Sequence, residues 1–153
     1  MTREEIATFD KVAVQLDSFY TETTVLVKKD PKAEMNVFKL KLINKVLVKA
    51  NEILGLMKPF DDFSEFDLDD IPNNGDVAMI LGQYISCLEE LRKDNVHISS
   101  GWWYWNVDGD ENTKDLFIGS FTKQIGCIDR KHDRFKRKCE GREDAVNDRD
   151  RHT

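Results

Sequence analysis

Apolar residues recur at alternating steps of three and four along the first part of the chain, which is the period of an amphipathic helix. Thr2 and Glu5 match the pattern of a capping box, so we expect this helix to begin at once and to end near residue 28. The predicted buried stripe consists of Ile6, Phe9, Ala13, Leu16, Tyr20, Thr23 and Val27.

A second helix is predicted from about Pro31 to Leu54. Asp30 would cap it and Pro31 would take its first position, where a missing N–H costs nothing. Gly55 follows as the left-handed residue that ends many helices. The short connection predicts an antiparallel helical hairpin. The buried stripe is predicted to be Met35, Phe38, Leu42, Val46, Ala50 and Ile53, widened by Ile43, Leu47 and Leu54.

A loop and a third helix follow. Residues 58–76 contain Pro59, Pro72 and Gly75 and show no helical stripe, which is typical of a loop. The third helix is predicted to be capped by Asn74 or Asp76 and to end near residue 93. Its stripe consists of Val77, Ile80, Leu81, Tyr84, Cys87, Leu88 and Leu91.

From residue 96 the period changes to β-branched and aromatic residues. We expect a turn at residues 99–101, a short strand at 101–107 and, at most, a small β-hairpin near 101–112. Residues 114–140 again favour a helix, which Gly126 would interrupt, so the segment would form either one helix or two. The predicted fold is mainly α, a bundle of about four helices opened by the long antiparallel hairpin. Residues 1–140 would form one domain and residues 141–153 a polar, frayed tail.

Composition narrows the class of protein. The 153 residues are 40% hydrophobic and 34% charged, with a net charge of −6, which suits one globular acidic domain. The chain has no apolar run of about 18 residues, and its first 20 residues are too charged for a signal peptide. Three widely spaced cysteines are typical of reduced thiols. We therefore expect a cytoplasmic protein that contacts no membrane.

Metal and cofactor sites are not expected. Cys127, His132 and Cys139 lack the paired spacing of a zinc site. The chain also contains no G-x-S-x-G, P-loop, G-x-G-x-x-G or H-E-x-x-H motif. We therefore predict a protein that is not an enzyme and needs no cofactor, and a metal-dependent enzyme with an unrecognised site is the weakest alternative.

An acidic-aromatic segment is the first candidate for function. Residues 60–71 interleave six carboxylates with large apolar side chains. The phenylalanines would either pin a solvated loop onto the bundle or anchor a basic partner that the carboxylates steer. The candidate partner-binding residues here are Asp61, Asp62, Phe63, Phe66, Asp67, Asp69 and Asp70.

A tryptophan-rich segment, residues 102–105, is the second candidate and contains every Trp of the chain. On a strand, Trp102 and Tyr104 would share one side, and Trp103 and Trp105 the other. One side would enter a core, and the other would be covered by the chain or would contact a partner. Trp102, Trp103 and Trp105 complete the predicted partner-binding set.

A basic cluster near the C-terminus is the third candidate. Six bases in nine residues would either form a solvated helix face or contact the phosphates of nucleic acid. Pairing of this cluster with the acidic segment, within one chain or in a homo-oligomer, is a further alternative. The cluster consists of Arg130, Lys131, Arg134, Lys136, Arg137 and Lys138.

These features together predict a non-enzymatic protein-interaction module. It would act as a small acidic inhibitor, an immunity-type neutraliser or an accessory subunit. It would bind a protein partner through the acidic-aromatic and Trp-rich segments, and a basic partner is one alternative. The alternative is a nucleic-acid-associated accessory protein that uses the basic C-terminal cluster.

Overall fold

The structure is a computed structural model, and it describes residues 1–109. Residues Met1–Asn95 form one compact unit, and a second unit begins at Val96. The first unit contains three α-helices and a short 3-10 helix, and the described part of the second is a two-stranded antiparallel sheet. The predicted mainly α class is therefore confirmed. The predicted fourth helix, 114–140, and the tail lie outside the described residues, and the predicted domain boundaries stay a prediction.

Helix α1 (Arg3–Lys29) begins at the predicted capping box. The hydroxyl of Thr2 accepts from the Glu5 N–H at 3.2 Å, and the Glu5 carboxylate accepts from the Thr2 N–H at 2.8 Å. Most of the predicted stripe is buried, although Tyr20 is exposed. The buried residues of α1 are Ile6, Phe9, Val12, Ala13, Leu16 and Thr23.

Helix α2 (Val37–Leu54) begins six residues later than the sequence predicts, and this is a correction. The Asp30 carboxylate does accept from the backbone N–H groups of Lys32 and Ala33, but the turn it closes does not continue as a helix. Asn36 is the actual cap, and its side chain accepts from the N–H groups of residues 38 and 39.

Long-range backbone pairing explains this difference. Residues 31–35 are bonded to the segment that precedes and opens the third helix. The Met35 N–H donates to the Pro72 carbonyl at 2.9 Å, and the Asn74 N–H donates to the Ala33 carbonyl at 2.9 Å. In a helix, the backbone N–H and carbonyl groups of residues 31–35 would point along the helix axis and bond within the helix. Their bonds to residues 72–75 therefore exclude a helix before residue 37.

The buried face of α2 is also rotated relative to the predicted one. Phe38 is 69% exposed and Leu42 is 37% exposed, although both were predicted to be buried. The helix carries apolar side chains on several sides, so its spacing is compatible with more than one stripe. Its buried residues are Leu40, Ile43, Asn44, Val46, Leu47, Ala50 and Leu54.

Gly55, with φ +54°, ends α2 as predicted and opens the short 3-10 helix η1 (Gly55–Met57). Helix α3 (Asn74–Asp94) is capped by Asn73 and not by Asn74 or Asp76, which is a correction. The Asn73 Oδ1 accepts from the Asp76 N–H at 2.8 Å. Val77, Leu81, Tyr84 and Leu88 of the predicted stripe are buried.

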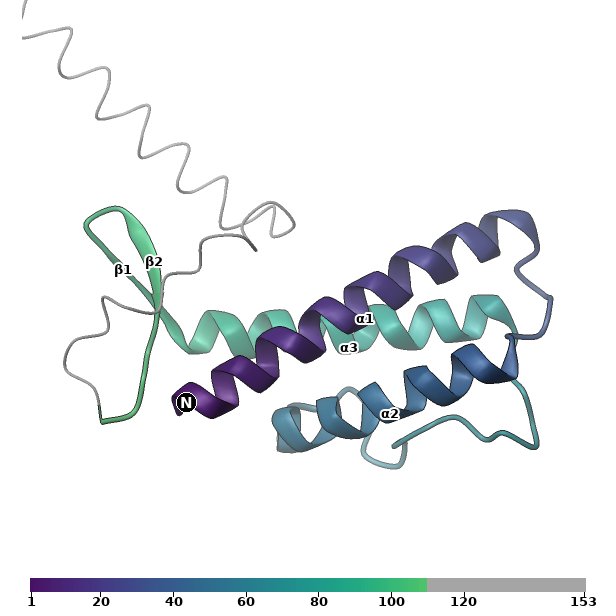
Figure 1. The fold of residues 1–153 in the computed structure, drawn as a ribbon, viewed down its shortest axis with the longest axis horizontal. Coiled ribbons are helices and arrows are strands. Elements are labelled where there is room, and N and C mark those ends of the chain that lie inside the picture. The colour runs from purple at the N-terminus through teal and green to yellow at the C-terminus, as the bar shows by residue number, and fades with distance from the viewer. Residues whose placement is uncertain (110–153) are drawn as a thin grey trace, which may run out of the picture. The chain divides into compact units, whose positions relative to one another are not determined.

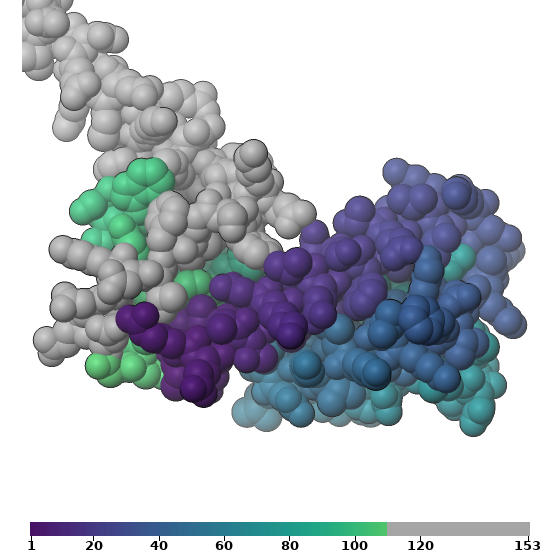
Figure 2. Space-filling view, viewed as in Figure 1, coloured from purple at the N-terminus to yellow at the C-terminus, as the bar shows by residue number. Residues whose placement is uncertain are grey.

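Helix α1 lies against both α2 and α3 and runs antiparallel to them, so α2 and α3 run in the same direction (Figure 1). The connection between two parallel neighbours must return along a helix of about 27 Å, which is why residues 58–73 form a long loop. In the space-filling view, α1 and α2 form one continuous surface (Figure 2). The core consists of side chains at or below 2% exposure, among them Phe9, Leu16, Leu40, Leu47, Leu81 and Tyr84.

One end of the α1–α3 interface is polar. Arg92 is 3% exposed, and its guanidinium lies over the Phe9 ring, 5.3 Å from the ring centroid. Its Nη1 is 3.8 Å from a carboxylate oxygen of Glu89. Burial lowers the pKa of Arg92, and the charges of Glu89 and Asp10 oppose that shift.

The sheet of the second unit consists of β1 (Val96–Ser99) and β2 (Trp102–Trp105), so the hairpin spans 96–105 rather than 101–112, a correction. Ser100 and Gly101 connect the strands with φ values of +50° and +81°, as a two-residue type I′ turn requires. The predicted turn is thus confirmed. Strand β2 is shorter than the strand predicted at 101–107. Its partner strand, β1, was not predicted, because four residues directly after a helix show no clear alternation of apolar and polar side chains.

Candidate partner-binding site

The 58–73 loop is fixed to α2 by two asparagine side chains. Asn44 accepts from the Phe66 N–H at 2.9 Å and donates to the Phe66 carbonyl at 2.8 Å, and both bonds are buried. Two turns further along α2, Asn51 donates to the Ser64 carbonyl at 3.0 Å. A loop without regular structure has few backbone partners of its own, so these bonds fix its path along the helix.

Helix α3 supports the same contact. The Tyr84 hydroxyl, on a side chain that is fully buried, donates to Asn51 Oδ1 at 2.7 Å. Burial raises the pKa of Tyr84, and the Asn51 bond opposes part of that shift. Asn51 therefore bonds the loop through one end of its amide and α3 through the other, which orients the amide.

Aromatic rings fill the space between the loop and the helices. The Phe63 and Phe66 rings meet edge to face with centroids 5.2 Å apart, and Phe63 lies 6.3 Å from the Tyr84 ring. Phe60 packs edge to face on Phe63 at 6.2 Å. Phe66 is 8% exposed and Phe63 is half-buried, so the two predicted anchors of the loop pack against their own protein. Their rings hold the loop in place and leave Phe66 no surface for a partner.

The carboxylates take the opposite orientation. All five predicted aspartates are exposed, and Glu65 is exposed between them. The only base of the loop, Lys58, donates its ammonium to the backbone carbonyl of Asp61 at 2.8 Å. Asp67 accepts from the Asp69 N–H at 2.8 Å, which closes a turn at the tip. The exposed aspartates are Asp61, Asp62, Asp67, Asp69 and Asp70.

The three tryptophans of the hairpin differ in exposure. Trp105 is 2% exposed, Trp103 is half-buried and Trp102 is 49% exposed. The register pairs Trp102 with Ser99 and Tyr104 with His97. The His97 ring stacks on the Tyr104 ring with centroids 5.9 Å apart. Trp102 is therefore the member of the set with the largest surface available to a partner.

Other predicted candidates lie outside the described residues. These are the basic cluster of residues 130–138 and the cysteine and histidine set at 127, 132 and 139. Within residues 1–109, no group of three histidine, cysteine, aspartate or glutamate side chains is placed to hold a metal ion. In the same part of the chain, every helix is too short or too polar to cross a membrane.

The residues that fix the loop were not predicted from the sequence. Asn44 and Asn51 lie inside a predicted helix, where an asparagine indicates a structural role only when it is near an end and can cap the helix. Their spacing of seven places both on one side of α2, which is the one signal that was present.

Comparison with known proteins gives no further guide, because no family model, curated protein or solved structure matches the chain.

Proposed function

We propose that the protein is a non-enzymatic interaction module that presents the 58–73 loop to a basic region of a protein partner. The observation that carries this proposal is the orientation of the loop. Its backbone is bonded to Asn44 and Asn51 and its phenylalanines pack inward, while five aspartates remain exposed. An inhibitor, a neutraliser and an accessory subunit are the roles that such a surface suits.

Preorganisation is the physical basis of the proposal. A free loop loses conformational freedom when a partner binds, and that loss weakens the affinity. The asparagine bonds and ring contacts of this loop already restrict it before binding. The aspartates also repel one another, and no base among residues 1–109 forms an ion pair with their side chains. A basic partner would relieve that repulsion and would be steered toward the loop.

Trp102 is the apolar anchor that we assign to the second unit. Half of this large side chain is exposed, and aromatic residues at that exposure dominate the binding energy of many interfaces. Trp105 has no such surface, so the predicted anchoring role passes to Trp102 and the partly exposed Trp103.

The test replaces four loop aspartates by asparagine, in the variant D61N/D62N/D69N/D70N. Asp67 stays, because it accepts the hydrogen bond of the loop turn. A matched control, E22Q/E34Q/E90Q/D94N, removes the same number of exposed charges elsewhere in the first unit. The material that the wild-type chain captures from source lysate, with and without nuclease treatment, is compared with the material that each variant captures.

A partner that the control retains and the loop variant loses supports the proposal. Trp102→Ala should weaken capture of the same partner. Retention of every partner by the loop variant would contradict the function proposed for the loop. Capture of nuclease-sensitive material alone would favour nucleic acid as the partner.

A further inference from the structure

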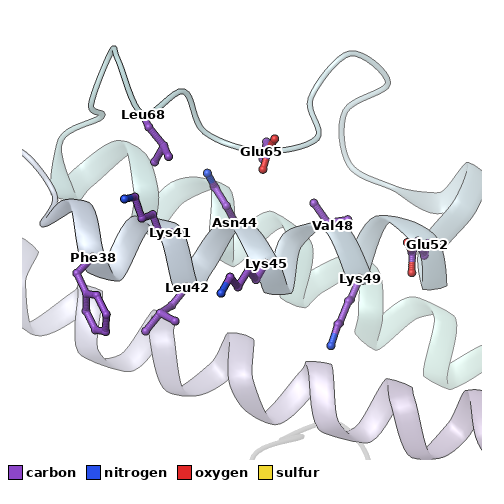
Figure 3. Close-up of a pocket in the computed structure, with 10 residues that line it drawn as sticks. All are labelled: Phe38, Lys41, Leu42, Asn44, Lys45, Val48, Lys49, Glu52, Glu65 and Leu68. Atoms are coloured by element: carbon purple, nitrogen blue, oxygen red, sulfur yellow. The ribbon is translucent and has the colours of Figure 1, made fainter.

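Helix α2 has a second apolar face that the bundle does not cover. Phe38, Leu42 and Val48 are 69%, 37% and 40% exposed, and all three are large apolar side chains. Leu68 of the loop, 38% exposed, lies across from them. Together they line a shallow groove of about 680 Å³ along α2. Figure 3 shows Leu68 and Glu65 on the loop side of this groove, and Phe38 and Leu42 on the side away from the loop.

The same groove is basic. Lys41, Lys45 and Lys49 line it at steps of four, so their ammonium groups follow one another along the helix. Within residues 1–109, no carboxylate forms an ion pair with any of the three. Helix α2 carries four lysines against a single glutamate, Glu52, while the net charge of the whole chain is −6. The lining contains these three lysines against two glutamates, Glu52 and Glu65, so the groove is a cationic and apolar surface on an acidic protein.

We infer that this groove docks an acidic amphipathic helix of a partner protein. The exposed apolar residues of α2 extend from Phe38 to Val48, ten steps along the helix and a length of about 15 Å, which matches about three turns of a second helix. Such a helix places apolar side chains at steps of three and four into the groove. Its flanking carboxylates then meet the lysines, whose long stems lie along apolar surface.

The surroundings of the groove disfavour other occupants. An anionic membrane or a nucleic acid presents an extended array of charges that would meet the carboxylates of the whole neighbouring loop, Glu65 and Asp67 among them, whereas a single helix can place its carboxylates beside the lysines alone. On α1 and α3 of a second copy, the large apolar side chains left exposed are few and widely spaced, namely Val14, Tyr20, Val25 and Met79. The stripes of α1 and α3 form the core, and the rings of Phe63 and Phe66 pack inward. The inference goes beyond the function proposed for the loop, because the groove selects the opposite charge.

The experiment uses the full chain and a fluorescein-labelled synthetic helix of about three turns, with leucines on one stripe and glutamates beside it. A second peptide carries lysine in place of each glutamate. Fluorescence anisotropy at low salt should show binding of the glutamate peptide that is at least about tenfold tighter than that of the lysine peptide, and the difference should shrink in high salt.

Two variants localise the binding. K41E/K45E/K49E should weaken binding of the glutamate peptide by about tenfold or more, whereas the control K11E/K28E/K32E, on exposed lysines outside the groove, should weaken it far less. Phe38→Ser tests the apolar half and leaves the core intact, since Phe38 is mostly exposed. If circular dichroism shows that K41E/K45E/K49E does not fold, the effect of Phe38→Ser on peptide binding is the test of the groove.

Several outcomes would overturn the inference. They are equal binding of the two peptides, unchanged binding by Phe38→Ser, and an equal loss in both lysine variants. Self-association of the wild-type chain that the groove substitutions abolish would assign the groove to a second copy instead. Binding to phosphatidylserine vesicles that the same substitutions abolish, without peptide binding, would assign it to a membrane surface.

Discussion

The α1–α3 interface and the contact between α2 and the 58–73 loop hold one unit together by different means. Along α1 and α3, side chains from two regular helices interlock and exclude water, as Leu16 and Leu81 do at zero exposure. At the loop, the contact is made by one buried ring, Phe66, and by two asparagine side chains that hydrogen-bond to backbone groups of the loop. Helices satisfy their own backbone, so apolar packing suffices for them. An irregular segment needs polar anchors, and its charged side chains are then left on the surface.

The largest effect should follow from a cavity in the helical interface. Leu81→Ala should lower the free energy of unfolding by about 2–5 kcal/mol, since Leu81 is fully buried. Urea unfolding followed by circular dichroism measures this loss. Met79→Ala, on the same helix but 59% exposed, is the control and should change stability by less than about 0.5 kcal/mol. Equal losses in the two variants would contradict the assignment of Leu81 to the core.

A smaller and local effect should follow at the loop. Asn44→Ala removes both bonds to Phe66 and leaves a buried N–H and a buried carbonyl unpaired, at a cost of about 1–3 kcal/mol. Hydrogen exchange should speed up in residues 60–71 and stay slow in α1 and α3. The exposed neighbour Lys45→Ala provides the control. Uniform acceleration across all three helices would show that loop and bundle open as one.

The tyrosine that links the two regions should matter less. Tyr84→Phe keeps the buried ring and removes only the hydroxyl that donates to Asn51, so we expect a loss of about 1 kcal/mol. The Asn51 amide would still donate to the loop, and exchange near Ser64 should rise only slightly. A loss as large as that of Asn44→Ala would mean that Asn51 is oriented mainly by Tyr84.

The smallest effect should appear at the polar end of the helical interface and should depend on pH. Burial raises the pKa of Asp10, and Arg92 opposes this shift. Because the folded pKa lies above the unfolded one, ionised Asp10 disfavours folding at neutral pH, and that cost disappears as the pH falls below the ordinary aspartate pKa. Asp10→Asn should therefore stabilise the protein at neutral pH by about 0.5 kcal/mol or less.

The pH series supplies the control for this last substitution. The gain should vanish in acid, where wild-type Asp10 is protonated and both side chains are neutral. A variant that is less stable than the wild type at neutral pH would show that attraction to Arg92 outweighs the cost of burial.

How far the sequence predicts the fold depends on how local each signal is. The capping box at Thr2 and Glu5, the stop at Gly55 and the turn at Ser100 and Gly101 involve neighbours in the chain, and each was predicted. The start of α2 was not, because Met35 bonds to Pro72, a residue far along the chain. Local capping chemistry at Asp30 is present, yet the long-range pairing prevails over it.

The candidate site follows the same rule. The charge pattern correctly indicates a solvated acidic segment, because exposure of carboxylates is dictated by their own chemistry. Which phenylalanines turn inward depends on Asn44, Asn51 and Tyr84, which belong to two other elements. Nor does the spacing of α2 distinguish its buried face from the face of Phe38 and Leu42, since both have helical period.

The double bond between Asn44 and Phe66 has a consequence for redesign of the loop. Like a neighbouring strand, the asparagine amide pairs with both backbone groups of one residue, which sets a fixed point between segments of unconstrained length. Closing a somewhat longer flexible segment costs little additional entropy. We therefore expect extra residues to be tolerated after Asp70, beyond the turn that Asp67 closes, and not between Ser64 and Phe66. An epitope inserted after Asp70 would be displayed from a scaffold that keeps its register.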